Sequence, residues 1–241
     1  MADGLLGDEE LEVDIPGRLY RRVSIAAVIV KSQALVLVSH FTGHLATGFG
    51  GALKNLGMGC SSRRGKLVQH STAKPSIRKG KCTGCGECVT WCPQDAISLV
   101  DGIAAIEGKR CIGCGECLAV CRFDAVGYNW SETYEQLQRK VTEHAWGAVR
   151  GKEQKLLCIN VLTRITKDCD CLGAYEPIGP DIGILISRDP VALDRASLDL
   201  VEETLGEKLS SRAYDIPYRM QLEHAETIGF GASRYRLERL D

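Results

Sequence analysis

The sequence predicts an α/β host domain interrupted by a small, cysteine-rich α+β domain. Apolar runs typical of buried strands alternate with amphipathic helical stretches, both before residue 80 and after residue 127. Between these two regions lies a duplicated cysteine motif with a different sequence character. We therefore expect the first part of the host domain in residues 1–79, the inserted domain in residues 80–127 and the second part of the host in residues 128–241.

Composition and charge exclude several classes of protein. Of 241 residues, 44% are hydrophobic and 25% charged, which is typical of a globular chain. The 30 basic and 31 acidic residues leave a net charge of −1, so nothing favours nucleic acid as a partner. The longest apolar run, Ile25 to Val38, contains Lys31, Ser32 and Gln33. It is too short and too polar for a membrane span, so we expect no membrane insertion.

The 12 cysteines are the most unusual feature of the composition. Disulfide frameworks belong mainly to short secreted chains, whereas this chain is long and begins with an acidic stretch unlike a signal peptide. We therefore expect a cytoplasmic protein, because thiols stay reduced there and can hold metal.

One 17-residue stretch occurs twice, as Lys81 to Ile97 and as Arg110 to Val126. Every cysteine of the first copy recurs 29 residues later. Between the copies, residues 98–106 alternate in hydrophobicity around Asp101-Gly102, a pair that predicts a β-hairpin.

Each copy carries three cysteines two residues apart and a fourth after three more residues. In this spacing class the fourth cysteine ligates the other cluster, and we expect it to open a helix. Glycines between the cysteines allow tight turns that bring backbone N–H groups toward sulfur (Gly84, Gly86, Gly113 and Gly115). One [4Fe–4S] cluster is therefore assigned to Cys82, Cys85, Cys88 and Cys121, and a second to Cys111, Cys114, Cys117 and Cys92.

Zinc is the alternative metal for these cysteines. Structural zinc sites usually use two cysteine pairs separated by a dozen or more residues, a pattern that this repeat does not have. The stretch 80–127 instead resembles bacterial two-cluster ferredoxins, which implies transfer of single electrons. Pro93 follows the fourth cysteine as in that family, but Arg122 replaces the second proline. A cation beside a cluster favours the reduced state, so we expect the two potentials to differ.

The host elements are predicted from periodicity and helix-end signals. The region from Ile25 to Val38 reads as a buried helix and then a buried strand, and residues 34–40 as a strand covered on both faces. The other predicted elements are a helix over 131–149 capped by Ser131, buried strands over 156–165 and 182–187, a helix over 190–205 after Asp189, a helix over 217–228 and a final strand over 235–240.

A second resemblance covers most of the host. It rests on the segments His40 to His44, Gly48 to Cys60, Ser62 to Lys66, Cys169-Asp-Cys171 and Asp181 to Leu193. These resemble domain-of-unknown-function family 362, many members of which carry a ferredoxin insert at this place.

The glycine-rich stretch matches neither common nucleotide motif. Leu53 stands where a dinucleotide fingerprint needs its third glycine, and a P-loop fails because Leu67 follows Lys66. A loop ending at a helix N-terminus near Gly50-Gly51, with Lys54 and Asn55 beyond it, could hold a small anionic substrate. The alternative is close packing of the loop against the sheet.

Four cysteines lie outside the repeat. Cys158 lies in an apolar strand and reads as a buried small hydrophobe. Cys169 and Cys171 are two residues apart, so both could face one metal or form a redox pair. His40, His44 or Cys60 could complete such a site, and the alternative is a packing role only.

Three functions remain open. The favoured one is an electron-transfer protein that carries single electrons to or from a redox partner protein. The second is an oxidoreductase, a cluster-fed reductase with its active site in the host domain. The third is a structural or oxidant-sensing role. The spacing of the residues predicts no general acid–base pair. The candidate site residues of the host domain are His40, His44, Lys54, Cys60, Cys169 and Cys171.

Overall fold

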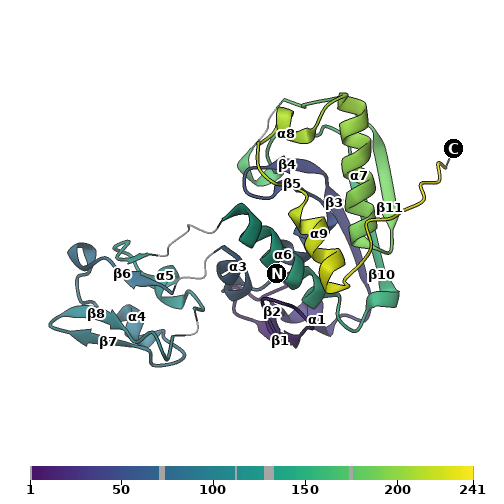
Figure 1. Ribbon diagram of the computed structural model, residues 1–241. Helices are drawn as coiled ribbons and strands as arrows, with labels where there is room; N and C mark the ends of the chain where they lie inside the picture. The colour runs from purple at the N-terminus through teal and green to yellow at the C-terminus, as the bar shows by residue number, and fades with distance from the viewer. Residues whose placement is uncertain (1, 71–73, 112, 128–132, 174–175, 241) are drawn as a thin grey trace. The chain divides into compact units, whose positions relative to one another are not determined.

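The computed structural model describes residues 2–70, 74–111, 113–127, 133–173 and 176–240 (Figure 1). The chain divides into two compact units. Residues 1–62 and 133–241 form the first, called here the α/β unit, and residues 63–132 form the second, called the cysteine-rich unit. The predicted mixture of helices and strands is confirmed.

A three-stranded sheet is the centre of the α/β unit (Figure 1). Its order is β11-β10-β3, with β3 Leu35–His40, β10 Leu156–Leu162 and β11 Gly183–Ser187. Strand β10 runs parallel to β3 and antiparallel to β11. Helix α7, Pro190–Leu205, packs on the face that carries Leu37, Cys158 and Leu185. That face is the middle of the hydrophobic core.

The opposite face of the sheet is exposed, which corrects the prediction of strands buried on both faces. Val36 and Val38 on β3 are 64% and 59% exposed, and Ile184 and Ile186 on β11 are 63% and 59% exposed. Their β-branched, apolar side chains favour strand conformation whether or not a second layer covers them. The apolar run therefore identified the strands correctly but overestimated their burial.

The α/β unit also contains pairs of short strands and a short helix. Strands β1, Glu10–Asp14, and β2, Arg22–Ala26, form an antiparallel pair, and β4, Thr42–His44, pairs with β5, Gly48–Gly50. Helix α1 spans only Ala27–Lys31. The predicted order of a helix and then a strand is confirmed, but Ala27 is the one buried residue of this helix. Ile25 precedes the helix on β2, where its pairing with Leu11 selects the extended conformation.

Further helical segments surround the core. They are α2 Ala52–Lys54, which continues as the π-helical η1 Asn55–Gly59, α6 Tyr134–Val149, α8 Leu209–Arg212, α9 Met220–Ile228 and the short turns η3 Glu153–Lys155 and η4 Asp170–Leu172. Helix α6 packs against η1, β2 and α9.

Some predicted boundaries of helices and strands are confirmed, and others differ by a few residues from the observed ones. The helix over 190–205 is confirmed, and Asp189 caps it by accepting hydrogen bonds from the N–H groups of Val191 and Ala192 at 2.8 and 3.1 Å. The N-cap of α6 is Thr133, while the predicted cap Ser131 lies outside the described residues. Strand β10 ends at Leu162, before the predicted residue 165, and α9 begins at residue 220 rather than 217.

The predicted final strand over 235–240 is wrong. These residues are exposed and have no strand partner among the described residues. Alternation in sequence does not make a strand unless a neighbouring strand supplies its hydrogen bonds.

The cysteine-rich unit contains short elements only. They are α3 Arg63–His70, β6 Ser76–Ile77, η2 Lys79–Lys81, α4 Glu87–Thr90, β7 Ile97–Val100, β8 Ile103–Ile106, α5 Glu116–Val120 and β9 Val126–Gly127. Strand β6 pairs with β9, and β7 with β8. The predicted hairpin is confirmed, with Asp101 and Gly102 at φ 51° and 75°, as its tight turn requires.

The sequence repeat is also a repeat of backbone conformation. Left-handed glycines precede both short helices, Gly86 at φ 79° and Gly115 at φ 80°. Helices α4 and α5 begin directly after these glycines, so Cys92 and Cys121 follow the helices. The prediction that the fourth cysteine opens a helix is therefore wrong. Among the described residues, no helix is long and apolar enough to cross a membrane.

Candidate cysteine centres and a cleft in the α/β unit

Four cysteines from both copies of the repeat line one cavity in the cysteine-rich unit. The cavity encloses about 360 Å³, and its cysteines are Cys82, Cys85 and Cys88 of the first copy and Cys121 of the second. Apolar side chains, among them Ile77, Leu99 and Val126, line much of the rest, together with Thr83 and Glu87.

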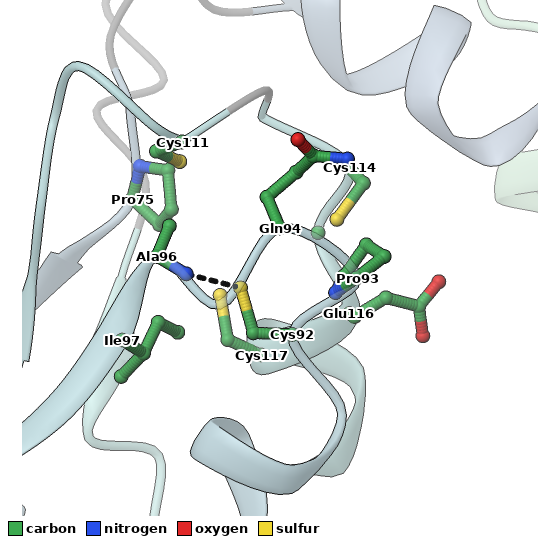
Figure 2. A pocket seen from close by; sticks show the side chains of 11 residues that line it. Pro75, Cys92, Pro93, Gln94, Ala96, Ile97, Cys111, Cys114, Glu116 and Cys117 are labelled. Carbon is green, nitrogen blue, oxygen red and sulfur yellow. Dashed lines mark hydrogen bonds between the residues drawn. The ribbon is translucent and has the colours of Figure 1, made fainter.

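The second cavity has the reciprocal composition (Figure 2). It encloses about 330 Å³ and is lined by Cys111, Cys114 and Cys117 of the second copy together with Cys92 of the first. Figure 2 shows the side chains of Cys92 and Cys117 near each other, beside Ile97. The structure thus divides the eight cysteines of the repeat into two crossed groups of four.

Backbone N–H groups donate hydrogen bonds to several of these sulfurs. Ala96 N donates to Cys92 Sγ at 3.2 Å, and Ala125 N donates to Cys121 Sγ at 3.3 Å, at equivalent positions of the two copies. Ala104 N donates to Cys82 Sγ at 3.4 Å. Such donors stabilise negative charge on sulfur.

The cysteine thiols differ in their ease of ionisation. Burial, reinforced by neighbouring cysteines, raises the pKa of Cys117 to about 12 and also raises the pKa values of Cys88 and Cys114. Burial acts in the same direction on Cys121, but N–H donors from Phe123, Ala125 and Val126 lower its pKa overall.

The described residues contain no arrangement suited to a single metal ion. No three His, Cys, Asp or Glu side chains among them converge on one point. Four thiolates that bind one zinc ion lie about 2.3 Å from a common point. The cysteines line their cavities without meeting at such a point.

A separate, open cleft of about 820 Å³ lies in the α/β unit at the carboxyl end of β3. Its chemically active side chains are His40, Lys54, Cys169, Asp170 and Cys171. Its other lining residues are Val38, Ser39, Thr42, Gly50, Gly51, Asn55, Met58 and Gly59.

Both ring nitrogens of His40 are engaged. Nε2 lies 2.8 Å from the carbonyl oxygen of Thr163, and Nδ1 lies 2.9 Å from both carboxylate oxygens of Asp170. Since a carbonyl and a carboxylate only accept, the ring donates to both when both nitrogens carry protons. His40 therefore links the Asp170 turn to β3.

The segment that carries the cleft cysteines is held in place just before η4. Thr166 donates to the backbone oxygen of Asp168 at 2.6 Å, and the Tyr214 hydroxyl donates to the Asp168 carboxylate at 2.6 Å. The thiols of Cys169 and Cys171 share a hydrogen bond, which is the main reason that the pKa of Cys171 is raised.

Lys54 enters the cleft from α2, and a buried carboxylate fixes that helix. Asp194 accepts from the N–H groups of Ala52 and Leu53 at 2.7 and 2.8 Å and from Asn160 Nδ2 at 2.8 Å. Burial raises the pKa of Asp194 to about 6 despite these donors. A Cβ on Gly51 would lie 2.3 Å from the Asp194 carboxylate, so glycine is needed for this close approach.

Residues 1–199 match the family model described as Domain of unknown function (DUF362). The chain belongs to the DUF362 family. No curated protein matches the sequence.

In this DUF362 protein, four of the six predicted host residues share the cleft, namely His40, Lys54, Cys169 and Cys171. Cys60 does not line it and instead belongs to the hydrophobic core, as does Cys158. His44 also lies outside its lining, and its Nδ1 accepts from the N–H of Thr47 at 3.1 Å. The predicted joining of Cys169 and Cys171 with a histidine or Cys60 around one metal is not supported by the described residues.

Sequence reasoning missed two residues that shape the cleft, one in its lining and one that holds α2. Asp170 lies between the two cleft cysteines, and its spacing from them was the available signal. Asp194 gave no signal, because it lies within an amphipathic helix and is separated by 142 residues from the N–H group that it caps.

Proposed function

We propose that this protein binds two [4Fe–4S] clusters and transfers single electrons to or from a redox partner protein. One observation carries the proposal. Each cavity of the cysteine-rich unit is lined by three cysteines of one repeat copy and the fourth cysteine of the other. This crossed combination is the ligand pattern of the bacterial two-cluster spacing class.

The donor set fits such clusters better than it fits zinc. All the candidate ligands are cysteine sulfurs, which iron in these clusters selects.

The chain itself would tune the potentials of the clusters and leave one cluster accessible to a partner protein. Its N–H groups at Ala96, Ala104 and Ala125 donate to ligand sulfurs and would tune the potentials. When bound, a [4Fe–4S] cluster provides one-electron redox chemistry. Cys85 is exposed, so the first cavity reaches the protein surface, where a partner protein could approach.

The crossed arrangement is tested by combining substitutions in anaerobically prepared protein. Wild type should contain about eight iron atoms per chain and Cys92→Ala about four. Adding Cys114→Ala to Cys92→Ala should cause no further loss, because both residues belong to one cavity. Adding Cys85→Ala instead should remove the remaining iron, because Cys85 belongs to the other cavity.

Iron and sulfide analysis with EPR of the reduced protein provides the readout. Cys171→Ser is the matched control, since it removes an exposed cysteine outside both cavities and should leave the iron count unchanged. Zinc in place of iron, or complete loss in the Cys92/Cys114 pair with half retention in the Cys92/Cys85 pair, would contradict the proposal.

A second candidate is a reductase whose active site is the cleft of the α/β unit. The observation that favours it is the grouping of His40, Lys54, Cys169 and Cys171 at the carboxyl end of β3. In open α/β sheets, ligands typically bind at the carboxyl ends of parallel strands, and β3 and β10 are parallel. Lys54 would attract a small anionic substrate there.

A further inference from the structure

We propose that Cys169 and Cys171 form a dithiol/disulfide couple that exchanges with a small disulfide substrate in the cleft of the α/β unit. This inference deepens the second candidate function by naming its substrate class and chemistry. It rests on the cleft alone and on no property of the cysteine-rich unit.

The positions and backbone conformation of Cys169 and Cys171 favour a disulfide bond between them. Cys169 is the N-cap of the 3-10 turn Asp170–Leu172, so the turn folds Cys171 back toward it. Residues two apart in such a turn have Cα atoms within the range that disulfides span. Both cysteines line the cleft, and Cys169 is the neighbouring group with the largest effect on the pKa of Cys171.

The surroundings hold the couple in place and leave it accessible. Asp170, between the two cysteines, is tied to His40, and Asp168, just before them, is tied to Tyr214. Cys171 is exposed and Cys169 half-buried, which assigns attack on the substrate to Cys171 and resolution to Cys169. Cys60 and Cys158, by contrast, are buried in the core.

The exchange balances in two steps. The Cys171 thiolate attacks one sulfur of the substrate disulfide, whose S–S bond breaks, and the departing thiolate takes up a proton. The Cys169 thiolate then attacks Cys171 Sγ, and the mixed disulfide releases the second substrate thiolate, which is also protonated. One substrate disulfide becomes two thiols, and the protein pair is oxidised to a disulfide. A dithiol such as dithiothreitol returns it to the reduced form.

The charged groups around the pair predict its pH dependence. The groups lining the cleft beside Cys171 are Cys169, Lys54 and the His40–Asp170 pair. The hydrogen bond with Cys169, and then burial, raise the pKa of Cys171, while the Lys54 ammonium acts in the opposite direction. Because the thiolate is the reactive form, the exchange rate should rise with pH. Lys54→Gln should slow exchange at neutral pH by roughly two- to fivefold.

Mass spectrometry of the full chain tests the couple. Anaerobic protein is equilibrated with mixtures of reduced and oxidised glutathione, quenched in acid, alkylated with N-ethylmaleimide and digested with trypsin. Cleavage after Lys167 and Arg188 gives a peptide in which Cys169 and Cys171 are the only cysteines. It should carry two alkyl groups at reducing ratios and none at oxidising ratios, with the mass of an internal disulfide.

Substitutions test the assigned roles. Cys169→Ser should accumulate a glutathione adduct on Cys171, whereas Cys171→Ser should form at least tenfold less adduct. Cys158→Ala removes a buried thiol elsewhere and should behave as wild type. Two alkyl groups at every glutathione ratio would overturn the inference. So would equal adduct formation by both serine variants.

Iron and sulfide are counted on the same samples. Loss of the couple with full cluster content would refute this inference alone. An intact couple in protein that binds no iron would refute only the proposed electron-transfer function.

Discussion

At the scale of single residues, the same amino acid has different roles in different surroundings. Cys158 is fully buried beneath α7, and burial raises its pKa to about 12, so it behaves as a small apolar side chain. Cys171 is exposed beside another thiol and Lys54, where it can react. The sequence distinguishes the two because Cys158 lies in an apolar run, whereas Cys171 follows Asp168, Cys169 and Asp170.

Arg122 carries a prediction at this scale. It is exposed and follows Cys121, whereas Arg63 near the other cavity is paired with Glu116. Arg122 therefore adds a cation next to Cys121, at the position where the first copy has Pro93. An exposed charge at a few ångströms is worth roughly 0.5–1 kcal/mol, or roughly 20–40 mV for one electron.

Arg122→Pro should lower the potential of the cluster assigned to Cys121 by that amount, because the charge that favours its reduced state is lost. Protein-film voltammetry measures the change, and Arg122→Lys is the control that should preserve the wild-type value. Two reduction waves that stay unchanged in Arg122→Pro would argue against the role of this cation.

At the scale of elements, local sequence signals predicted the ends of helices more accurately than they predicted which residues are buried. Asp189 and Gly206 define the two ends of α7, because capping depends on adjacent residues. The burial of β3 depends on whether another layer covers it, which no local pattern encodes. The exposed sheet face formed by Val36, Val38, Ile184 and Ile186 shows this difference.

The two faces of β11 should therefore respond differently to the same substitution. Ile186→Thr should change the free energy of unfolding by less than about 0.5 kcal/mol, because Ile186 is exposed. Leu185→Thr, the matched variant on the buried face, should cost about 2 kcal/mol or more. Urea unfolding followed by circular dichroism measures both. Equal losses would show that a further layer covers the outer face in solution.

At the scale of the whole molecule, distant contacts join the two stretches of the α/β unit. Buried Glu143 on α6 accepts from the N–H groups of Arg18, Leu19 and Tyr20 and from His224 on α9. Burial would raise the pKa of Glu143, but these donors lower it overall. One carboxylate thereby connects segments that lie more than 120 residues apart.

Stability of the α/β unit should fall in acid because of His144. Burial lowers the pKa of this histidine to about 4, whereas an unfolded histidine titrates near about 6.5. Its contribution is therefore present above pH about 6.5 and is lost as the pH falls toward 4. The expected loss between pH 7 and pH 5 is about 2 kcal/mol.

His144→Asn should reduce this loss, since its amide can replace Nδ1 as donor to the Lys140 carbonyl without titrating. Urea unfolding of wild type and variant at the two pH values isolates the effect, because all other titrating groups are common to both. Parallel pH dependences in the two proteins would contradict it.

By itself, the sequence determined the features that depend on neighbouring residues. These include the hairpin turn at Asp101-Gly102 and the capped helix over 190–205. Only the tertiary structure decided that His40, Lys54, Cys169 and Cys171 share a cleft while His44 and Cys60 do not. The reason is physical: His40 and Asp170 are 130 residues apart, so packing of the sheet and its loops brings them together and no local pattern records the contact.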